Sequence, residues 1–136
     1  MYFLMDLFNY TISIWNEADI KLQSGASEEL ILEFEKKLNF KFPKDFRSFY
    51  LKVNGFVDFE WNKNMFSLWS LERIYEESKF DQNLDYIAFC DYLINSHSMG
   101  FMKSRNGIFM NTTNEKVCET FEEFIGLLNT NSDKLY

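Results

Sequence analysis

ASEELILEFEKKLNFKFPKDFRSFYLKVNG, residues 26–55, is the stretch that decides the fold, because it predicts two amphipathic helices joined at the chain's only proline. Ser27 is a suitable N-cap for the first helix, and two acidic residues, Glu28 and Glu29, follow in its first turn. Apolar residues then recur with the helical period, so one face is expected to be buried. These residues are Leu30, Ile31, Phe34 and Leu38.

The second helix of this stretch is predicted to start at Pro43, because a proline at the first helical position has no hydrogen bond to lose. Asn54-Gly55 is expected to end this helix, with Gly55 in the left-handed conformation of a C-terminal cap. The residues expected on its buried face are Phe46, Phe49, Tyr50 and Val53.

A further helix is expected before this stretch, over Tyr2–Glu17, followed by a loop at residues 23–25. The helix has polar interruptions and no basic residue ahead of its apolar ones, so it predicts neither a secretory signal nor a membrane span. Its apolar face is expected to dock on the core, and self-association is the alternative. The residues of that face are Phe3, Leu7, Phe8, Ile14 and Trp15.

Short strands and two more helices are predicted after residue 55. Ser70 can cap a short helix, and Thr120 with Glu123 forms a capping box for a final helix that frays over 129–133. The turn dipeptide Asn-Gly places a hairpin connection at 104–107. The buried face of the final helix is expected to be Phe121, Phe124, Ile125 and Leu128. The strands are expected at 56–61, at 65–69 after a turn at 62–64, at 86–93, at 99–103, at 108–110 and from Val117 onward, with a polar connection at 79–85.

Helices at both ends and strands between them predict an α+β fold. We expect a single domain, residues 1–136, with a mainly antiparallel sheet flanked by N-terminal helices and a C-terminal helix. The length suits one domain, and 46% apolar residues, including 16 phenylalanines, can fill a sizeable core.

The net charge of −7 limits the partners that the chain can bind. It argues against direct contact with nucleic acid and against anionic membrane surfaces. It is complementary to a basic protein, although an acidic charge also serves ordinary solubility. Cys90 and Cys118 lie far apart and are expected to be buried thiols in a reducing cytosol, with a disulfide as the alternative. We therefore predict a cytoplasmic protein.

Residues for catalysis or cofactor binding are scarce in this sequence. His97 is the only histidine, and it stands seven positions from Cys90, which does not make a catalytic pair without geometric support. No cysteine or histidine cluster has zinc spacing, and the five glycines form no phosphate-binding loop. The sequence predicts no catalytic residue, no cofactor, no metal and no small-molecule ligand.

An acidic excess beside two tryptophans stands between residues 58 and 91. Tryptophan is enriched among the residues that dominate binding energy, and carboxylates attract a basic partner. The alternative is that the tryptophans are core residues of a hairpin and the acids a solvated face. The predicted partner-binding residues are Asp58, Glu60, Trp61, Trp69, Glu76, Glu77, Asp81, Asp85 and Asp91, and Glu72 belongs to the same acidic stretch.

The order of several motifs resembles the SUKH superfamily over roughly residues 24–131. The resemblance is carried by Glu28-Glu29, Phe42-Pro43 and Asn54-Gly55 in the opening helices, by residues 69–74 and 86–92, and by the closing residues 120–125. It implies the same α+β architecture and no catalytic residues. It also implies a bacterial immunity protein that binds and neutralises a cognate toxin domain, for which a basic nuclease is one candidate. The alternative is a regulatory or scaffolding module that binds an endogenous protein, as eukaryotic relatives do, and a small enzyme is a third, weaker hypothesis.

Overall fold

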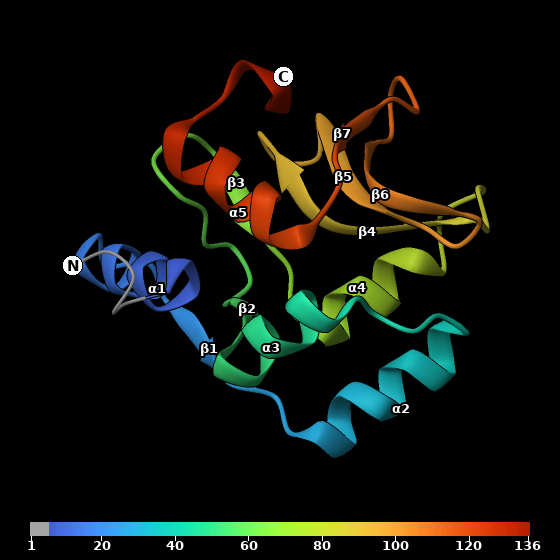
Figure 1. The fold of residues 1–136 in the computed structure, drawn as a ribbon, viewed down its shortest axis with the longest axis horizontal. Coiled ribbons are helices and arrows are strands. Elements are labelled where there is room, and N and C mark those ends of the chain that lie inside the picture. The colour runs from blue at the N-terminus through green and yellow to red at the C-terminus, as the bar shows by residue number, and fades with distance from the viewer. Residues whose placement is uncertain (1–5) are drawn as a thin grey trace.

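The computed structural model describes residues 6–136 and has the predicted α+β architecture, with helices packed on antiparallel sheets (Figure 1). The helices are α1 (Leu7–Glu17), α2 (Glu28–Leu38), α3 (Lys44–Lys52), α4 (Leu71–Ser78), α5 (Phe121–Thr130) and the 3₁₀ helix η2 (Asp133–Leu135). The strands are β1 (Leu22–Ser24), β2 (Val53–Phe56), β3 (Phe66–Leu68), β4 (Tyr86–Tyr92), β5 (His97–Met102), β6 (Arg105–Met110) and β7 (Lys116–Cys118).

The strands form two antiparallel sheets. One sheet has five strands in the order β3-β4-β5-β6-β7, and the other pairs β1 with β2. Helix α5 contacts β6 and β7, α4 contacts β4, and α3 contacts both α5 and β2. Helix α2 packs on α4 and lies at the lower border of the view, while α1 packs on α5 at the left (Figure 1). Buried residues from each of the helices α1–α5 and from strands of both sheets form one main core cluster.

An aromatic cluster centred on Phe46 fills this core. The Phe46 ring stacks on Tyr50 at 4.1 Å and on Phe42 at 4.5 Å, and Phe121 meets it edge-on at 5.0 Å. The Tyr50 hydroxyl donates a hydrogen bond of 2.6 Å to the carbonyl oxygen of Trp69, which satisfies the one polar group of that ring. The cluster ties α3 and α5 to the start of α4, because Trp69 directly precedes its N-cap residue.

The predicted N-caps of α2, α4 and α5 are confirmed. The predicted buried faces of α2, α3 and α5 are confirmed except at Leu30, which is half-buried, and Val53, which is buried but lies in β2. The hydroxyl groups of Ser27, Ser70 and Thr120 each accept the backbone N–H three residues later. The buried residues are Ile31, Phe34 and Leu38 on α2, Phe46, Phe49 and Tyr50 on α3, and Phe121, Phe124, Ile125 and Leu128 on α5. Pro43 is itself the N-cap of α3, one residue before the position predicted for it.

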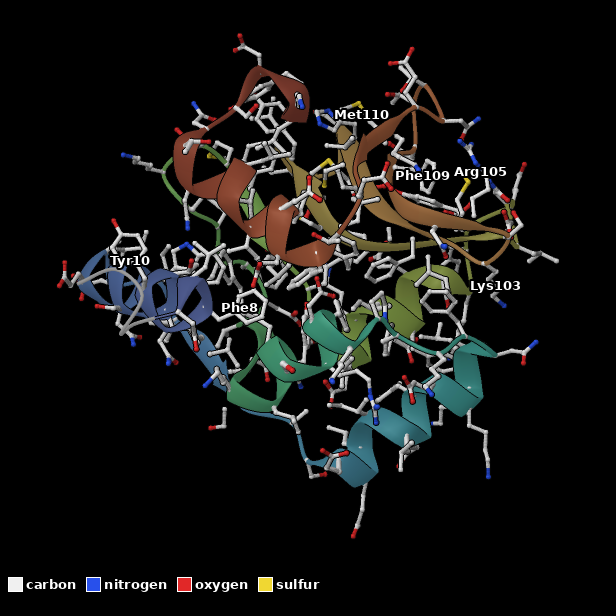
Figure 2. All side chains as sticks on the ribbon, in the orientation of Figure 1. Phe8, Tyr10, Lys103, Arg105, Phe109 and Met110 are labelled. Carbon is white, nitrogen blue, oxygen red and sulfur yellow. The ribbon has the colours of Figure 1, made fainter. Side chains whose placement is uncertain are left out.

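Helix α1 docks on the core, as one of the two interpretations of its apolar face predicts. Phe8 and Trp15 are buried and meet Phe49 edge-on at 5.0 and 5.9 Å. Figure 2 shows Phe8 on the side of α1 that faces the rest of the molecule, whereas Tyr10 is exposed. Asp6 caps the helix by accepting the N–H of Asn9, and the predicted first residues of the helix, including Tyr2 and Phe3, lie outside the described residues.

The segment around Gly55 differs from the prediction. Helix α3 ends at Lys52, and residues 53–56 form β2, so neither a helical Asn54-Gly55 end nor a strand at 56–61 exists. The predicted loop at 23–25 is largely strand β1, which pairs with β2 over a long sequence separation. Gly55 does have the predicted left-handed backbone, with φ of +70°, but inside a strand. A Cβ atom there would lie 2.6 Å from the backbone nitrogen of Ser70, so the close approach of two backbones requires the glycine.

The β5–β6 hairpin turns at Lys103 and Ser104, not across residues 104–107 as predicted. The Asp85 carboxylate accepts hydrogen bonds from the backbone N–H and the hydroxyl of Ser104, at 2.9 and 2.5 Å. This distant side chain stabilises the turn, so the Asn-Gly dipeptide becomes part of β6. On the same strand the Arg105 guanidinium lies 4.5 Å from the centre of the Phe109 ring, and Figure 2 shows the two side chains together.

The predicted fraying at residues 129–133 is also wrong. Asn131 takes a left-handed conformation that ends α5, and the chain continues into η2, where Leu135 is fully buried. The His97 Nε2 atom lies 2.8 Å from the carbonyl oxygen of Leu135, and the Tyr136 ring meets Phe66 and Tyr92 edge-on. The last residues are therefore packed on the β3–β4–β5 end of the sheet.

Candidate partner-binding site

A groove of about 700 Å³ opens between α4, the connection from β2 to β3 and the β4–β5 turn. Its walls come from segments that are distant in the sequence, and the elements that carry them meet through the β3–β4 pairing and the packing of α4 on β4. The lining residues are Gln23, Asp58, Phe59, Trp61, Met65, Ser67, Ser70, Glu72, Arg73, Glu76, Glu77, Asp91 and Ile94.

A buried carboxylate organises the floor of the groove. Asp91 is 3% exposed, and its Oδ1 atom accepts a 2.6 Å hydrogen bond from the Trp69 indole N–H. Its Oδ2 atom accepts the backbone N–H of Asn95 at 2.7 Å, which stabilises the β4–β5 turn. The Arg73 guanidinium lies 3.7 Å from Asp91 Oδ1 and 4.6 Å from the centre of the Trp69 ring. Asp91 thus fixes the positions of the Trp69 indole, the β4–β5 turn and the Arg73 guanidinium relative to one another.

Helix α4 supplies one wall, and Asn54 of β2 positions its first turn. The buried Asn54 amide accepts the backbone N–H of Leu71 at 2.9 Å and donates to Glu72 Oε1 at 3.0 Å. Because Ser70 caps the same turn, the start of α4 is held by two side chains. The carboxylates of α4 that face the groove therefore project from a rigid element.

The lining of the groove is strongly acidic. It contains the carboxylates of Asp58, Glu72, Glu76, Glu77 and Asp91 against a single guanidinium, so its formal charge is −4. Arg73 is already engaged, since its Nε atom lies 4.0 Å from Glu77 in addition to its contact with Asp91. Glu76 pairs only with the exposed Lys79, and Asp58 has no hydrogen-bond or ion-pair partner within residues 6–136. The groove has an unbalanced negative charge that a basic partner would neutralise.

Apolar side chains flank this charge. Phe59 is 86% exposed, Ile94 is 74% exposed and Trp61 is 40% exposed. Phe59, Met65 and Ile94 have left-handed backbones, with φ of +68°, +70° and +51°. Such values are unfavourable for bulky and β-branched residues and cluster at functional segments, since the surrounding structure must compensate for them. The groove combines exposed apolar groups with carboxylates, which is the composition of a protein-binding surface.

The predicted partner residues divide into two groups. Asp58, Trp61, Glu76, Glu77 and Asp91 line the groove, although Asp91 is buried in its floor. The remaining ones have structural contacts outside its lining; they are Glu60, Trp69, Asp81 and Asp85.

Each member of this second group has a structural contact elsewhere in the molecule. Glu60 accepts the backbone N–H of Lys21, Asp81 accepts that of Asn83, and Asp85 stabilises the β5–β6 turn. Trp69 is 2% exposed and is therefore a core residue.

Several lining residues are absent from the sequence-based prediction. Arg73 was detectable, because it stands four residues before Glu77 on a predicted helix and such pairs interact. Phe59, Met65 and Ile94 carry no comparable signal, since their place depends on unusual backbone angles.

The residues considered for catalysis lie elsewhere. His97 contacts the Leu135 carbonyl, and its ring lies 5.0 Å from the Tyr92 ring. Cys90 and Cys118 are free and buried, as predicted, and burial raises the pKa of the Cys90 thiol well above its ordinary value. Within residues 6–136 no group of three or more histidine, cysteine or carboxylate side chains is placed to hold a metal ion. No helix in that range is long and apolar enough to cross a membrane.

The chain matches a known protein family. Residues 25–127 match the model of the SMI1 / KNR4 family (SUKH-1), from just before α2 into α5. The matched region contains all the residues that line the groove except Gln23. No curated protein matches the chain.

Proposed function

Since the chain belongs to the SMI1 / KNR4 (SUKH-1) family, we propose that it is a non-catalytic immunity protein that binds and neutralises a toxin domain. The observation that carries the proposal is the acidic groove with its exposed apolar flanks. A surface of this kind stabilises a complex through buried aromatic anchors and directs association through its charge.

The partner that suits this surface is a basic protein domain. Nucleases are candidates, because a domain that binds a phosphate backbone carries lysine and arginine at its own site. An acidic protein that covers such a site blocks access of the substrate and needs no chemistry of its own. The carboxylates accelerate association and make its rate fall with salt, whereas Trp61 and Phe59 set the dissociation rate.

The test uses the C-terminal domain encoded by the gene adjacent to the one for this chain. We expect that domain to arrest growth when it is expressed alone, and we expect coexpression of this protein to restore growth. Titration calorimetry of the two purified proteins should give one-to-one binding. The proposal is refuted if the domain is not toxic, or if it stays toxic and unbound in the presence of this protein.

The groove also provides a graded test. Reversing the charges of Asp58, Glu76 and Glu77 together should slow association far more at low salt than at high salt. Trp61→Ala should instead raise the dissociation rate, because its ring is exposed in the groove. Stopped-flow kinetics at two ionic strengths separates these effects. If the association rates change neither with salt nor with charge reversal, these carboxylates are solvated surface residues outside the interface. That result would favour a regulatory module with a different interface.

A further inference from the structure

The groove holds one guanidinium of its own, and the surroundings of that group show what the groove can bind. The Arg73 guanidinium lies 4.6 Å from the centre of the Trp69 ring, 3.7 Å from Asp91 and 4.0 Å from Glu77. A planar cation is thus held by an aromatic face and two carboxylates, an arrangement that suits arginine better than lysine.

Among the residues described, the groove contains a second indole ring and further carboxylates that have no firmly held cation paired with them. Trp61 exposes its ring, Asp58 has no partner within the described chain, and Glu72 is hydrogen-bonded only to the neutral Asn54 amide. Glu76 pairs with Lys79, but both side chains are about half exposed or more, so this ion pair is weak and easily exchanged. An aromatic face and three available carboxylates therefore remain beside the occupied set.

We propose that the groove takes an arginine side chain of the partner protein, paired with Asp58, Glu72 and Glu76 and stacked on Trp61. The exposed Phe59 and Ile94 contact the apolar stem of that arginine and the chain on either side of it. The inference rests on the proposed function and specifies the chemistry by which its partner is recognised.

The indole N–H signals of the three tryptophans give a direct assay in heteronuclear NMR spectra. Trp15 and Trp69 are 4% and 2% exposed and serve as internal references, whereas Trp61 is in the groove. The probes are acetyl-Gly-Arg-Gly-amide and the same peptide with lysine or with the neutral isostere citrulline. The arginine peptide should shift the Trp61 signal to saturation, the lysine peptide should bind about threefold or more weakly, and citrulline should give no shift.

Neutralising the three carboxylates tests the site itself. The variant Asp58→Asn, Glu72→Gln, Glu76→Gln should bind the arginine peptide at least about tenfold more weakly. The matched control neutralises three exposed carboxylates outside the groove, Glu17→Gln, Glu29→Gln and Glu115→Gln, and should bind like the unchanged protein. If the triple groove variant fails to fold, Asp58→Asn alone should weaken binding by about threefold, since it removes no internal contact.

Two results with the peptides would overturn the inference. One is an equal Trp61 shift with arginine and citrulline, which would show that charge is not recognised. The other is undiminished binding of the arginine peptide by the groove variant. A toxin domain that binds the groove variant as tightly as the unchanged protein would also refute the arginine site, while leaving the proposed immunity function intact.

Discussion

Replacement of Asp91 by alanine tests the central feature of the groove floor. The Asp91 carboxylate accepts the Trp69 indole N–H, accepts the Asn95 N–H and lies beside the Arg73 guanidinium. Asp91→Ala removes all three contacts at once and leaves a cavity only a few atoms in size. We expect the protein to fold but with a clearly lower free energy of unfolding.

The magnitude follows from the burial of each partner. Trp69 is 2% exposed, so in the variant its indole N–H is buried without a hydrogen-bond partner and without access to water. Such an unsatisfied donor costs about 1–3 kcal/mol. Asn95 is exposed, so water replaces most of its lost hydrogen bond. Arg73 keeps its contact with Glu77 and a side-chain exposure of 26%, which limits its loss to about 1 kcal/mol. The total is about 2–4 kcal/mol, a large part of the roughly 5–15 kcal/mol typical of a folded domain.

Urea denaturation followed by circular dichroism measures this free energy. A double-mutant cycle with Trp69→Phe isolates the indole–carboxylate hydrogen bond, and its coupling energy should be about 1.5–3 kcal/mol. Asp58→Ala is the matched control, because it removes an exposed carboxylate from the same groove and should change stability by less than about 0.5 kcal/mol. A coupling energy below about 0.5 kcal/mol would refute the argument that Asp91 and Trp69 stabilise one another.

Three further predictions concern the backbone, the thiols and the C-terminal contact. Gly55→Ala should cost about 2–4 kcal/mol, from its left-handed backbone and the clash with the chain before α4, whereas Gly126→Ala in open space on α5 should stabilise slightly. Equal melting temperatures for the two would contradict this reasoning. Burial raises the pKa of the Cys118 thiol from 9.0 to about 12, so the unfolded chain deprotonates first. The free energy of unfolding should therefore fall as pH rises from 9 towards 12, and Cys118→Ala should lessen that slope in denaturation curves. His97→Ala should lower stability by about 0.5–1.5 kcal/mol, because it removes the contact with Leu135. The variant should still bind the proposed toxin domain. Lost binding by a folded variant would place His97 in the interface.

The helices were the predictable part of the fold, because their signals are local. Ser27 and Thr120 satisfy backbone N–H groups within their own first turns, and the apolar period follows directly in each case. The errors arise where a distant residue decides the local conformation. Strand β1 exists because β2 pairs with it, and the β5–β6 turn moves because Asp85 binds Ser104. A short strand or a turn has too few residues to overcome such contacts.

The candidate site was predictable in its charge but not in its geometry. The carboxylates of α4 belong to a helix that the sequence predicts. Their position in the same groove as Trp61, however, depends on the path of the connection between β2 and β3, which the sequence does not predict. Asp81 and Asp85 look equivalent to these carboxylates in the sequence, yet the Asp81 carboxylate binds the backbone N–H of Asn83 and the Asp85 carboxylate binds that of the distant Ser104. Aspartate close to turn residues frequently binds the backbone two residues on, as Asp81 does, and this local signal favours a structural role over a binding role for it.

The exposure of Phe59 and Ile94 has a consequence for how this protein can change under selection. An apolar side chain contributes to folding through the area that it buries, and these two bury little. Substitutions on their segments, 57–65 and 93–95, can therefore alter recognition while the phenylalanine core and its hydrogen-bonded floor are retained. If the proposed function is right, related proteins that bind different toxin domains can differ at these segments without losing the fold. We expect their sequences to diverge there first.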